Sequence, residues 1–226
     1  MDVMATESQR TERRTDALSK ARIVEAAIEI LDAEGESALT FRALSARLST
    51  GAGAIYWHVA NKNELLTTAT EGVIAVVMAG IADDEDPRES IRTIALGVFD
   101  AIDAHPWVGT QLTAEPWQSA VLHIFEAFGS RIGALSVPER AQFDSTSALV
   151  SYVLGLAAQY AAGARAISRQ TDRTDFLTAV AAQWTQQDPA KFPFVHQVAA
   201  QLPDHDDREQ FMAGIDLFLA GIASIE

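Results

Sequence analysis

Residues 39–66 of the chain read LTFRALSARLSTGAGAIYWHVANKNELL, and this stretch decides the fold. Thr40 is a good N-cap for a short helix, because its hydroxyl can accept a hydrogen bond from a free backbone N–H. The apolar side of that helix carries Phe41, Leu44 and Leu48. A turn over 49–51 separates it from a third short helix, which is predicted from about 52 to 59.

Helices are also predicted on both sides of this stretch. One face of residues 19–34 is apolar and carries Ile23, Ala27, Ile30 and Leu31. Gly35 follows as a helix stop. Asn61 caps the next helix, with Glu64 three residues on in the capping-box position. Three short helices with a tight turn between the second and third are typical of a helix-turn-helix.

The third helix is predicted to bury one edge and expose the other. At about 100° per residue, Ile55 and Val59 point together toward the core, while Gly53 and Trp57 point away from it. The outward edge is small at its start and then aromatic and polar, so a major groove about 12 Å wide can admit it. For Trp57 taken alone, partly buried packing is the alternative.

The exposed residues of this region can be assigned to parts of a DNA duplex. Ala54 is expected to meet a thymine methyl group, and Arg42 to read guanine, because its guanidinium matches O6 and N7. Three side chains are expected nearer the phosphates: Tyr56, His58 and Lys62. Thr40 begins the second helix, and the N-terminus of a helix offers free N–H groups to a phosphate.

The charge distribution is compatible with this assignment. The net charge of −14 at first argues against a nucleic-acid partner. However, residues 1–62 hold 8 of the 17 Lys and Arg and 9 of the 31 acids, so their net charge is only −1. Residues 37–63 contain no acid, yet they hold Arg42, Arg47, His58 and Lys62. Such a window is typical of a surface that faces phosphates, although three Lys and Arg also occur together by chance.

The quoted stretch resembles the helix-turn-helix of the tetracycline-repressor (TetR) family, most specifically in YWHV at 56–59 and NK at 61–62. The similarity is strong over about residues 17–70. Beyond it, FMAGIDLFLAGI at 211–222 resembles the dimerisation helix of the family, and HPW at 105–107 resembles part of its effector domain. The resemblance implies a repressor that binds a palindromic operator as a dimer and is released by an effector.

By position, the DNA-contacting sites of the family fall on Arg42, Ala52, Gly53, Ala54, Tyr56, Trp57, His58 and Lys62. The chain departs from the tetracycline repressor itself at 52–54, where polar, proline and hydroxyl side chains would otherwise reach bases. Residues 51–54 offer no side-chain hydrogen bond, so readout is expected to depend on Arg42, methyl contacts and DNA shape. This departure leaves an alternative open: a helical small-molecule-binding protein whose DNA-binding head is inactive.

The rest of the chain is predicted to form longer helices. Their approximate ranges are 62–81, 88–104, 116–135, 138–168, 173–187 and 205–224. Loops are expected between them, among others around Pro106 and Pro116 and in DPAKFPF at 188–194. No alternating strand pattern of useful length is present, so the predicted fold class is all-α.

Three parts of the chain are expected to differ in their roles. Residues 1–16 are predicted to be a flexible tail, 17–65 the helix-turn-helix DNA-binding domain, and 66–226 a helical ligand-binding and dimerisation domain. The partners that the resemblance implies are a double-stranded DNA operator, a second copy of the chain and a small-molecule effector.

Two helices are apolar enough to pair with a second chain. Residues 145–164 carry no charge, and the last helix has an apolar stripe with glycines that permit close approach. Two such helices per chain suit an intermolecular four-helix bundle. The residues expected at this interface are Leu149, Val153, Leu156, Phe211, Gly214, Ile215, Phe218, Gly221 and Ile222. Ordinary core packing within one chain is the alternative.

An effector pocket is expected to combine aromatic walls with a few polar anchors. The candidates are Trp107, Gln111, Trp117, Phe125, Phe128, Tyr152, Gln159 and Trp184. No metal site and no cofactor is predicted, because the histidines lack the spacing of metal ligands. An enzyme of the helical-bundle type is the remaining rival, but no paired carboxylates at Glu-x-x-His spacing and no nucleophile motif support it.

A membrane protein is not expected. Residues 145–164 are long enough to cross a bilayer, but their serines, Thr146 and Gln159 make them a poor match to hydrocarbon. Residues 1–20 lack the apolar segment of a secretory signal. The chain has no cysteine, which fits a reducing compartment. The expected location is therefore the cytoplasm.

Overall fold

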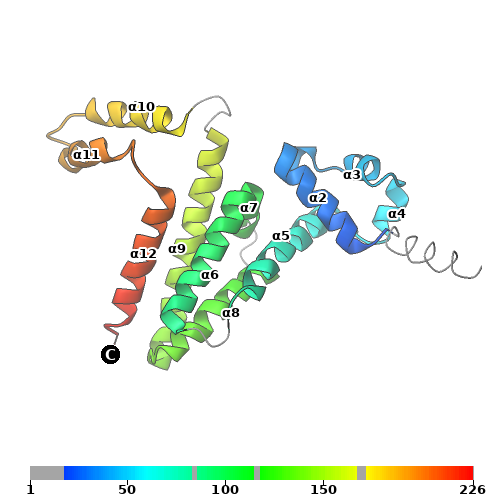
Figure 1. Cartoon of the computed structure of the whole chain (residues 1–226), viewed down its shortest axis with the longest axis horizontal. Coiled ribbons are helices and arrows are strands. Elements are labelled where there is room, and N and C mark those ends of the chain that lie inside the picture. The colour runs from blue at the N-terminus through cyan, green and yellow to red at the C-terminus, as the bar shows by residue number, and fades with distance from the viewer. Residues whose placement is uncertain (1–17, 83–85, 115–117, 167–171, 226) are drawn as a thin grey trace, which may run out of the picture. The chain divides into compact units, whose positions relative to one another are not determined.

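The computed structural model describes residues 18–82, 86–114, 118–166 and 172–225. These residues form two compact units, which divide between Val73 and Ile74 (Figure 1). The division lies within a helix, whereas the sequence predicted a boundary after residue 65. Helices account for all regular secondary structure in the described ranges, as the all-α prediction requires.

The first unit is a set of short helices with capped ends. Its elements are α2 (Lys20–Glu34), η1 (Glu36–Ala38), α3 (Phe41–Arg47), α4 (Ala52–Tyr56) and the first part of α5 (Lys62–Ala79). The Ser19 hydroxyl accepts a hydrogen bond from the backbone N–H of Arg22 and so caps α2. The Thr40 hydroxyl accepts one from the N–H of Ala43 at 3.1 Å, which confirms the predicted cap of α3.

The second unit is built from longer helices. They are α6 (Pro87–Ala104), α7 (Pro106–Ala114), α8 (Ser119–Ala134), α9 (Glu139–Ala166), α10 (Arg173–Thr185), α11 (Pro193–Val198), η2 (Ala199–Gln201) and α12 (Asp207–Ile222). In Figure 1, α6, α8, α9 and α12 lie along one another, and the contacts between these helices agree. None of the helices in the described ranges has the length and apolarity that crossing a bilayer requires.

Two of these helices were predicted as loops, and that prediction is wrong. The sequence assigned the regions around Pro106 and Pro193 to connections. In the structure each proline begins a helix, because the first turn needs no N–H donor from that residue and the fixed φ of proline suits it. The helix α7 is a structural core element, since Val108 and Leu112 are fully buried.

Two ion pairs connect α6 to α12 at positions about two helical turns apart. Arg92 on α6 pairs with Asp216 on α12 at 2.8 Å. Asp100 on α6 pairs with Arg208 on α12, also at 2.8 Å. In the first pair the base lies on α6 and the acid on α12, whereas in the second pair the acid lies on α6 and the base on α12. Sliding or reversing either helix would therefore place like charges together. The exposed pairs thus specify an antiparallel register more than they add stability.

Most residues predicted for a dimer interface are instead core residues of one chain. Less than a tenth of the surface of Leu149, Val153, Phe211, Ile215 and Ile222 is exposed. Leu156, Gly214 and Phe218 are half-buried, and Gly221 is exposed. The apolar stripe of α12 therefore faces α6 and α9 of its own chain, which corrects the assignment of these buried residues. A second chain that packs on α9 and α12 would meet the opposite faces of these helices.

Gly214 allows α12 to approach the Tyr152 ring of α9. A Cβ atom at position 214 would overlap the Tyr152 hydroxyl oxygen. That hydroxyl donates a hydrogen bond to the backbone carbonyl of Phe211 at 3.1 Å. The ring also packs near Phe218, with 5.3 Å between the ring centroids. Burial of the Tyr152 hydroxyl raises its pKa above the ordinary value.

Replacing Gly214 with Ala is expected to reduce the free energy of unfolding by about 1–3 kcal/mol, because the added methyl group must displace a packed ring. Urea denaturation measures the change. Gly72→Ala is the matched control, since a methyl group there meets open space. Its stability is expected to stay level or to rise by up to about 1 kcal/mol from helix propensity. Equal stability of the two variants would contradict this account of Gly214.

Candidate nucleic-acid interface and ligand cavity

The segment made of α4 and the turn that follows it, residues 52–59, has one buried edge and one exposed edge. Ile55 is 0% exposed and Val59 is 1% exposed, whereas Trp57 is 90% exposed. Both buried side chains belong to the same core as Leu44 of α3, as the helical projection predicted. The structure therefore confirms that Trp57 points away from the core. The indole surface is therefore available for contact with another molecule.

The regular part of α4 is shorter than predicted. It ends at Tyr56, and the backbone N–H groups of His58 and Val59 both donate to the Ile55 carbonyl, at 2.9 and 3.1 Å. The exposed Trp57 and His58 thus lie in a tight turn after the helix rather than within it. This turn directs the chain back to the core at Val59.

The connection between α3 and α4 is a tight turn, as predicted. Ser49 adopts a φ of 50°, a left-handed conformation that is uncommon for a residue with a side chain. The Thr50 N–H donates to the Ser45 carbonyl at 3.0 Å and closes the end of α3. These bonds fix where α4 begins relative to α3, which is the defining geometry of a helix-turn-helix.

Tyr56 contacts α3 through its ring. The ring stacks on Phe41, with centroids 4.3 Å apart and planes inclined by 9°. The side chain nevertheless remains 54% exposed, because the stack covers only one of its faces. Phe41 was predicted only as an apolar residue of α3, so sequence reasoning missed its role in positioning Tyr56.

The three basic residues of the acid-free window differ in their surroundings. Arg42 is exposed, and it has no hydrogen bond or ion pair with any residue in the described ranges. Arg47 pairs with Glu29 of α2 at 2.6 Å. Lys62 donates to the backbone carbonyl of Glu36 at 2.7 Å. Arg42 therefore has the side chain that is most available for a base. Lys62, which is predicted to face phosphate, contacts η1 in the chain without DNA.

Residues 51–54 present a bare backbone. Gly51, Ala52 and Gly53 are exposed, and Ala54 is half-buried. A Cβ atom built on either glycine would meet nothing within 4 Å. Another surface can therefore approach the start of α4 closely, although this segment offers no side-chain donor to a base.

The start of α5 is fixed by a network around Glu64. The Asn61 side chain accepts from the Glu64 N–H at 2.9 Å, and Glu64 accepts from the Ala60 N–H at 2.8 Å. Glu64 also pairs with Lys20 of α2 at 3.0 Å. The Ala60 N–H and, after it, Lys20 lower the pKa of the Glu64 carboxyl. The predicted capping box is thus present, with its return bond one residue earlier than expected.

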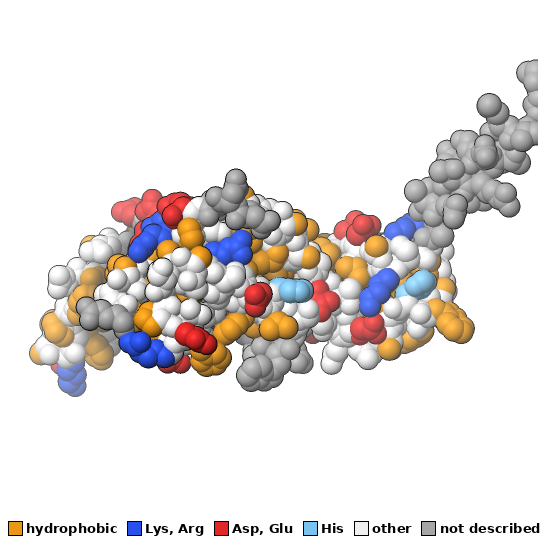
Figure 2. Space-filling view, turned by 90° about the horizontal axis from the view of Figure 1, so that it is seen from below, with side chains coloured by type: hydrophobic (Ala, Val, Ile, Leu, Met, Phe, Trp, Pro, Cys, Tyr) orange, Lys and Arg blue, Asp and Glu red, His pale blue; other side chains and the backbone are white. Residues whose placement is uncertain are grey.

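Basic and acidic side chains are interspersed with hydrophobic ones on the face of the molecule drawn in Figure 2. That face carries no broad area of a single charge sign.

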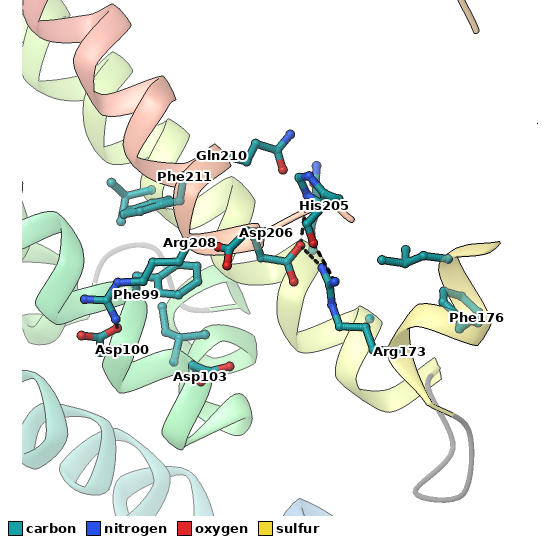
Figure 3. A pocket seen from close by; sticks show the side chains of 16 residues that line it. Phe99, Asp100, Asp103, Arg173, Phe176, His205, Asp206, Arg208, Gln210 and Phe211 are labelled. Carbon is teal, nitrogen blue, oxygen red and sulfur yellow. Dashed lines mark hydrogen bonds and ion pairs between the residues drawn. The ribbon is translucent and has the colours of Figure 1, made fainter. Parts of the chain in front are cut away.

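The second unit contains a cavity of about 690 Å³ between α6, α9, α10 and the start of α12. Its size is suited to a drug-sized molecule. Its apolar walls are Phe99, Ile102, Val153, Phe176, Leu177 and Phe211, and its polar lining includes Asp100, Asp103, Arg173, His205 and residues 206–208. Figure 3 shows the labelled side chains arranged around this cavity, with Arg173 linked to His205 and to the start of α12.

The described lining of the cavity contains none of the aromatic residues predicted for a ligand. Of the eight candidates only Gln159 lines it. Trp107 and Phe128 are buried core residues, and Gln111, Phe125, Tyr152 and Trp184 are half-buried elsewhere. Trp117 lies outside the described residues. Aromatic content identified several core residues but not the cavity, because the cavity is lined by residues of α6, α9, α10 and the start of α12, which are far apart in the sequence.

Residues 23–69 match the family described as bacterial regulatory proteins, tetR family. The solved structure of the transcriptional regulator SCO7222, a TetR from Streptomyces coelicolor, is 46% identical in sequence, with a TM-score of 0.83. The similarity covers 92% of this chain and 99% of that one. The chain belongs to the TetR family. It is accordingly a helix-turn-helix transcriptional regulator and not an enzyme.

Two further relatives differ in how much of the chain they match. An HTH-type transcriptional regulator from Saccharopolyspora erythraea is 29% identical over 108 residues, which are 48% of this chain and 46% of the relative. The chain thus spans about half the length of that protein. A tetracycline repressor protein of class G from Vibrio anguillarum is 28% identical over 90% of this chain and 93% of the relative.

In this TetR-family protein, acid is expected to reduce the stability of the DNA-binding head, the first unit up to Val73, through Glu64. Because its pKa is lowered in the folded state, its stabilising contribution is present above the ordinary value of 4.5 and is lost as the pH falls below it. Thermal unfolding of the wild type should approach that of Glu64→Gln as the pH falls from 7 to below 4.5.

The matched control for this experiment is Glu71→Gln, which removes a carboxylate of the same helix that has no hydrogen bond in the described ranges. It is expected to unfold like the wild type at pH 7. A constant difference between wild type and Glu64→Gln from neutral to acid pH would contradict the assigned role of Glu64.

Proposed function

We propose that this protein is a repressor that binds a palindromic operator as a homodimer and leaves it when a small molecule enters the cavity of the second unit. The observation that carries the proposal is the two-edged α4, with Ile55 buried and Trp57 90% exposed after a tight turn from α3. The similarity to a tetracycline repressor over 90% of this chain supports repression as the direction of regulation. DNA binding in turn supports the cytoplasm as the site of action.

The operator reading that we propose is led by Arg42. Its side chain extends from the first turn of α3 without an intramolecular partner in the described ranges, so no ion pair has to break when it meets a guanine. Trp57 and the half-exposed Tyr56 ring add apolar contacts to sugar or methyl groups. The bare segment 51–54 permits close approach and shifts the remaining selectivity to DNA shape.

Arg42→Ala is expected to relax the preference at one base position of each half-site by about 1–3 kcal/mol, because one bidentate contact is lost. Arg47→Ala is the matched control, since the Arg47 side chain is already paired with Glu29. It should reduce the affinity for all sequences slightly and leave the preference unchanged. Selection of bound DNA with each variant measures both effects, and an unchanged Arg42→Ala preference would refute the role of Arg42.

The function as a whole is tested by selecting duplexes from a random pool with the full chain. Enrichment of a palindrome with half-site centres about one helical turn apart is the expected result. Absence of any enriched site would favour the alternative of a small-molecule-binding protein with an inactive head, which the side-chain-poor segment 51–54 motivates.

The dimer that we propose uses the faces of α9 and α12 that the protomer leaves exposed. On α9 these are Ala148, Ser151 and Gly155, and on α12 they are Ala213, Leu217 and Ala220. Each set recurs at intervals of three or four residues and therefore forms one stripe. Small side chains let helix axes approach closely, so the two stripes suit a four-helix bundle with a second copy. Leu217, 74% exposed, supplies the large apolar contact.

Leu217→Glu is expected to shift the protein toward monomer and to weaken operator binding, because it places a charge at the centre of this face. Val76→Glu is the control, since Val76 of α5 is 75% exposed and lies outside the stripe. Sedimentation velocity over a range of concentrations measures the effect. If Leu217→Glu stays dimeric like Val76→Glu, the interface must lie elsewhere.

We further propose that the cavity acts on DNA binding through α6. Phe99 and Asp100 line the cavity, and Gly97 precedes them on the same helix. A Cβ atom at Gly97 would lie 2.6 Å from the Val77 side chain of α5, so α5 packs on α6 at this point without space to spare. A ligand that displaces α6 at Gly97 would therefore push on Val77 near the end of α5, the helix whose first turn carries Lys62 and Glu64.

A further inference from the structure

The lining of the cavity carries an excess of negative charge. Its acids are Asp100, Asp103, Asp206 and Asp207, and its fixed bases are Arg173 and Arg208, with His205 as a titratable neighbour. Four carboxylates against two guanidinium groups leave an excess of negative charge. The charge that a ligand meets in the cavity depends on which of these groups already have partners.

Both guanidinium groups are already paired. Arg208 pairs with Asp100 at 2.8 Å. Arg173 pairs with Asp207 at 2.7 Å and also donates to the backbone carbonyl of His205 at 2.7 Å. An anionic ligand would have to displace one of these carboxylates before it could reach a cation. The cavity thus has no free basic side chain among the lining residues that the structure describes.

The helix N-termini beside the cavity, which attract anions, are also occupied. The Asp206 carboxylate accepts from the Glu209 N–H at 2.8 Å, and this bond lowers its pKa. Asp172 caps α10 in the same way by accepting from the Thr174 N–H at 2.7 Å. These two carboxylates hold the positions that an anionic group of a ligand would otherwise take.

Asp103 is the exception among the four acids. It lies in the last turn of α6 and lines the cavity, and it has no hydrogen bond or ion pair with a described residue. The carbonyl groups at the end of α6 add partial negative charge near its side chain. Figure 3 shows Asp103 on the α6 side of the cavity, with Phe176 of α10 across from it.

The Asp103 side chain is exposed, and the other lining residues of the cavity include aromatic and aliphatic side chains. Phe211 and Val153 are each 1% exposed and form the inner wall, and the Phe99 ring packs on Phe211 with 5.0 Å between centroids. Phe176 and Leu177 extend the apolar surface from α10. A rigid ring system can therefore be covered on two sides while one end remains near Asp103.

We propose that the effector class of this cavity is a polycyclic or aromatic molecule that carries one positively charged amine, which pairs with Asp103. The proposal rests on the proposed function in that it uses the same cavity. Beyond the proposed function, it specifies the charge of the ligand and the residue that recognises that charge. Neutral molecules of the same shape bind less tightly, and anions are rejected because no unpaired cation meets them.

Three anthracene compounds of matched shape test the proposal on the full chain without DNA. They are 2-(aminomethyl)anthracene, which is cationic at neutral pH, 2-(hydroxymethyl)anthracene and anthracene-2-carboxylate. Titrations followed by anthracene fluorescence are expected to show the amine binding about tenfold more tightly than the alcohol, and the carboxylate least tightly. Carboxylate binding equal to or tighter than amine binding would overturn the proposal, as would no binding of any of the three.

Asp103→Asn supplies the decisive comparison. It should reduce amine affinity about tenfold, to the level of the alcohol, and leave alcohol affinity unchanged. Asp175→Asn is the matched control, because it removes the same charge from α10 at a position that does not line the cavity. Asp103→Lys should reverse the order of amine and carboxylate. An amine affinity that is equal in the wild type, Asp103→Asn and Asp175→Asn would overturn the assignment of Asp103.

The outcome is separable from that of the proposed function. Ligand titration needs no operator, and operator selection needs no ligand. Charge-selective binding that depends on Asp103 would support the inference even if DNA binding were never detected. Operator binding by a protein that does not discriminate between the amine and the carboxylate would uphold the regulator and overturn the inference.

Discussion

The structure of the head depends on the burial of two aliphatic side chains, Ile55 and Val59, in the core that Leu44 also enters. A helix as short as α4 has too few backbone hydrogen bonds to be stable alone, so tertiary packing must hold it in place. Once those two side chains are buried, the opposite edge of the segment faces the solvent. Trp57 is exposed as a consequence of that packing, and the indole becomes available to a partner.

Many of the carboxylates in this strongly acidic chain pair with bases or cap helices. In the head, Glu29 and Glu64 pair with bases, which leaves Arg42 as the basic side chain of α3 without a partner in the described ranges. In the second unit, carboxylates cap α6, α10 and α12 or join α6 to α12. A net charge of −14 is therefore compatible with a DNA-binding head.

Glycine has different roles at different helix contacts. Gly214 and Gly97 allow a side chain of a neighbouring helix to occupy the space that a methyl group would fill. Gly51 and Gly53 have open space around them instead. The first pair is explained by packing within the chain, whereas no described neighbour requires glycine at the second pair.

The sequence by itself determined the helical elements with strong caps and periodic faces, because hydrogen bonds between neighbours and apolar spacing are local properties. It also determined that Ile55 is buried and Trp57 exposed, since a helix has a fixed angular repeat. Only the tertiary structure decided that α12 directs its apolar stripe into its own chain, and that Asp103 joins Phe176 and Phe211 around one cavity. Asp103 and Phe211, which are far apart in the sequence, line the same cavity because the helices pack together. No local pattern encodes a contact over that separation.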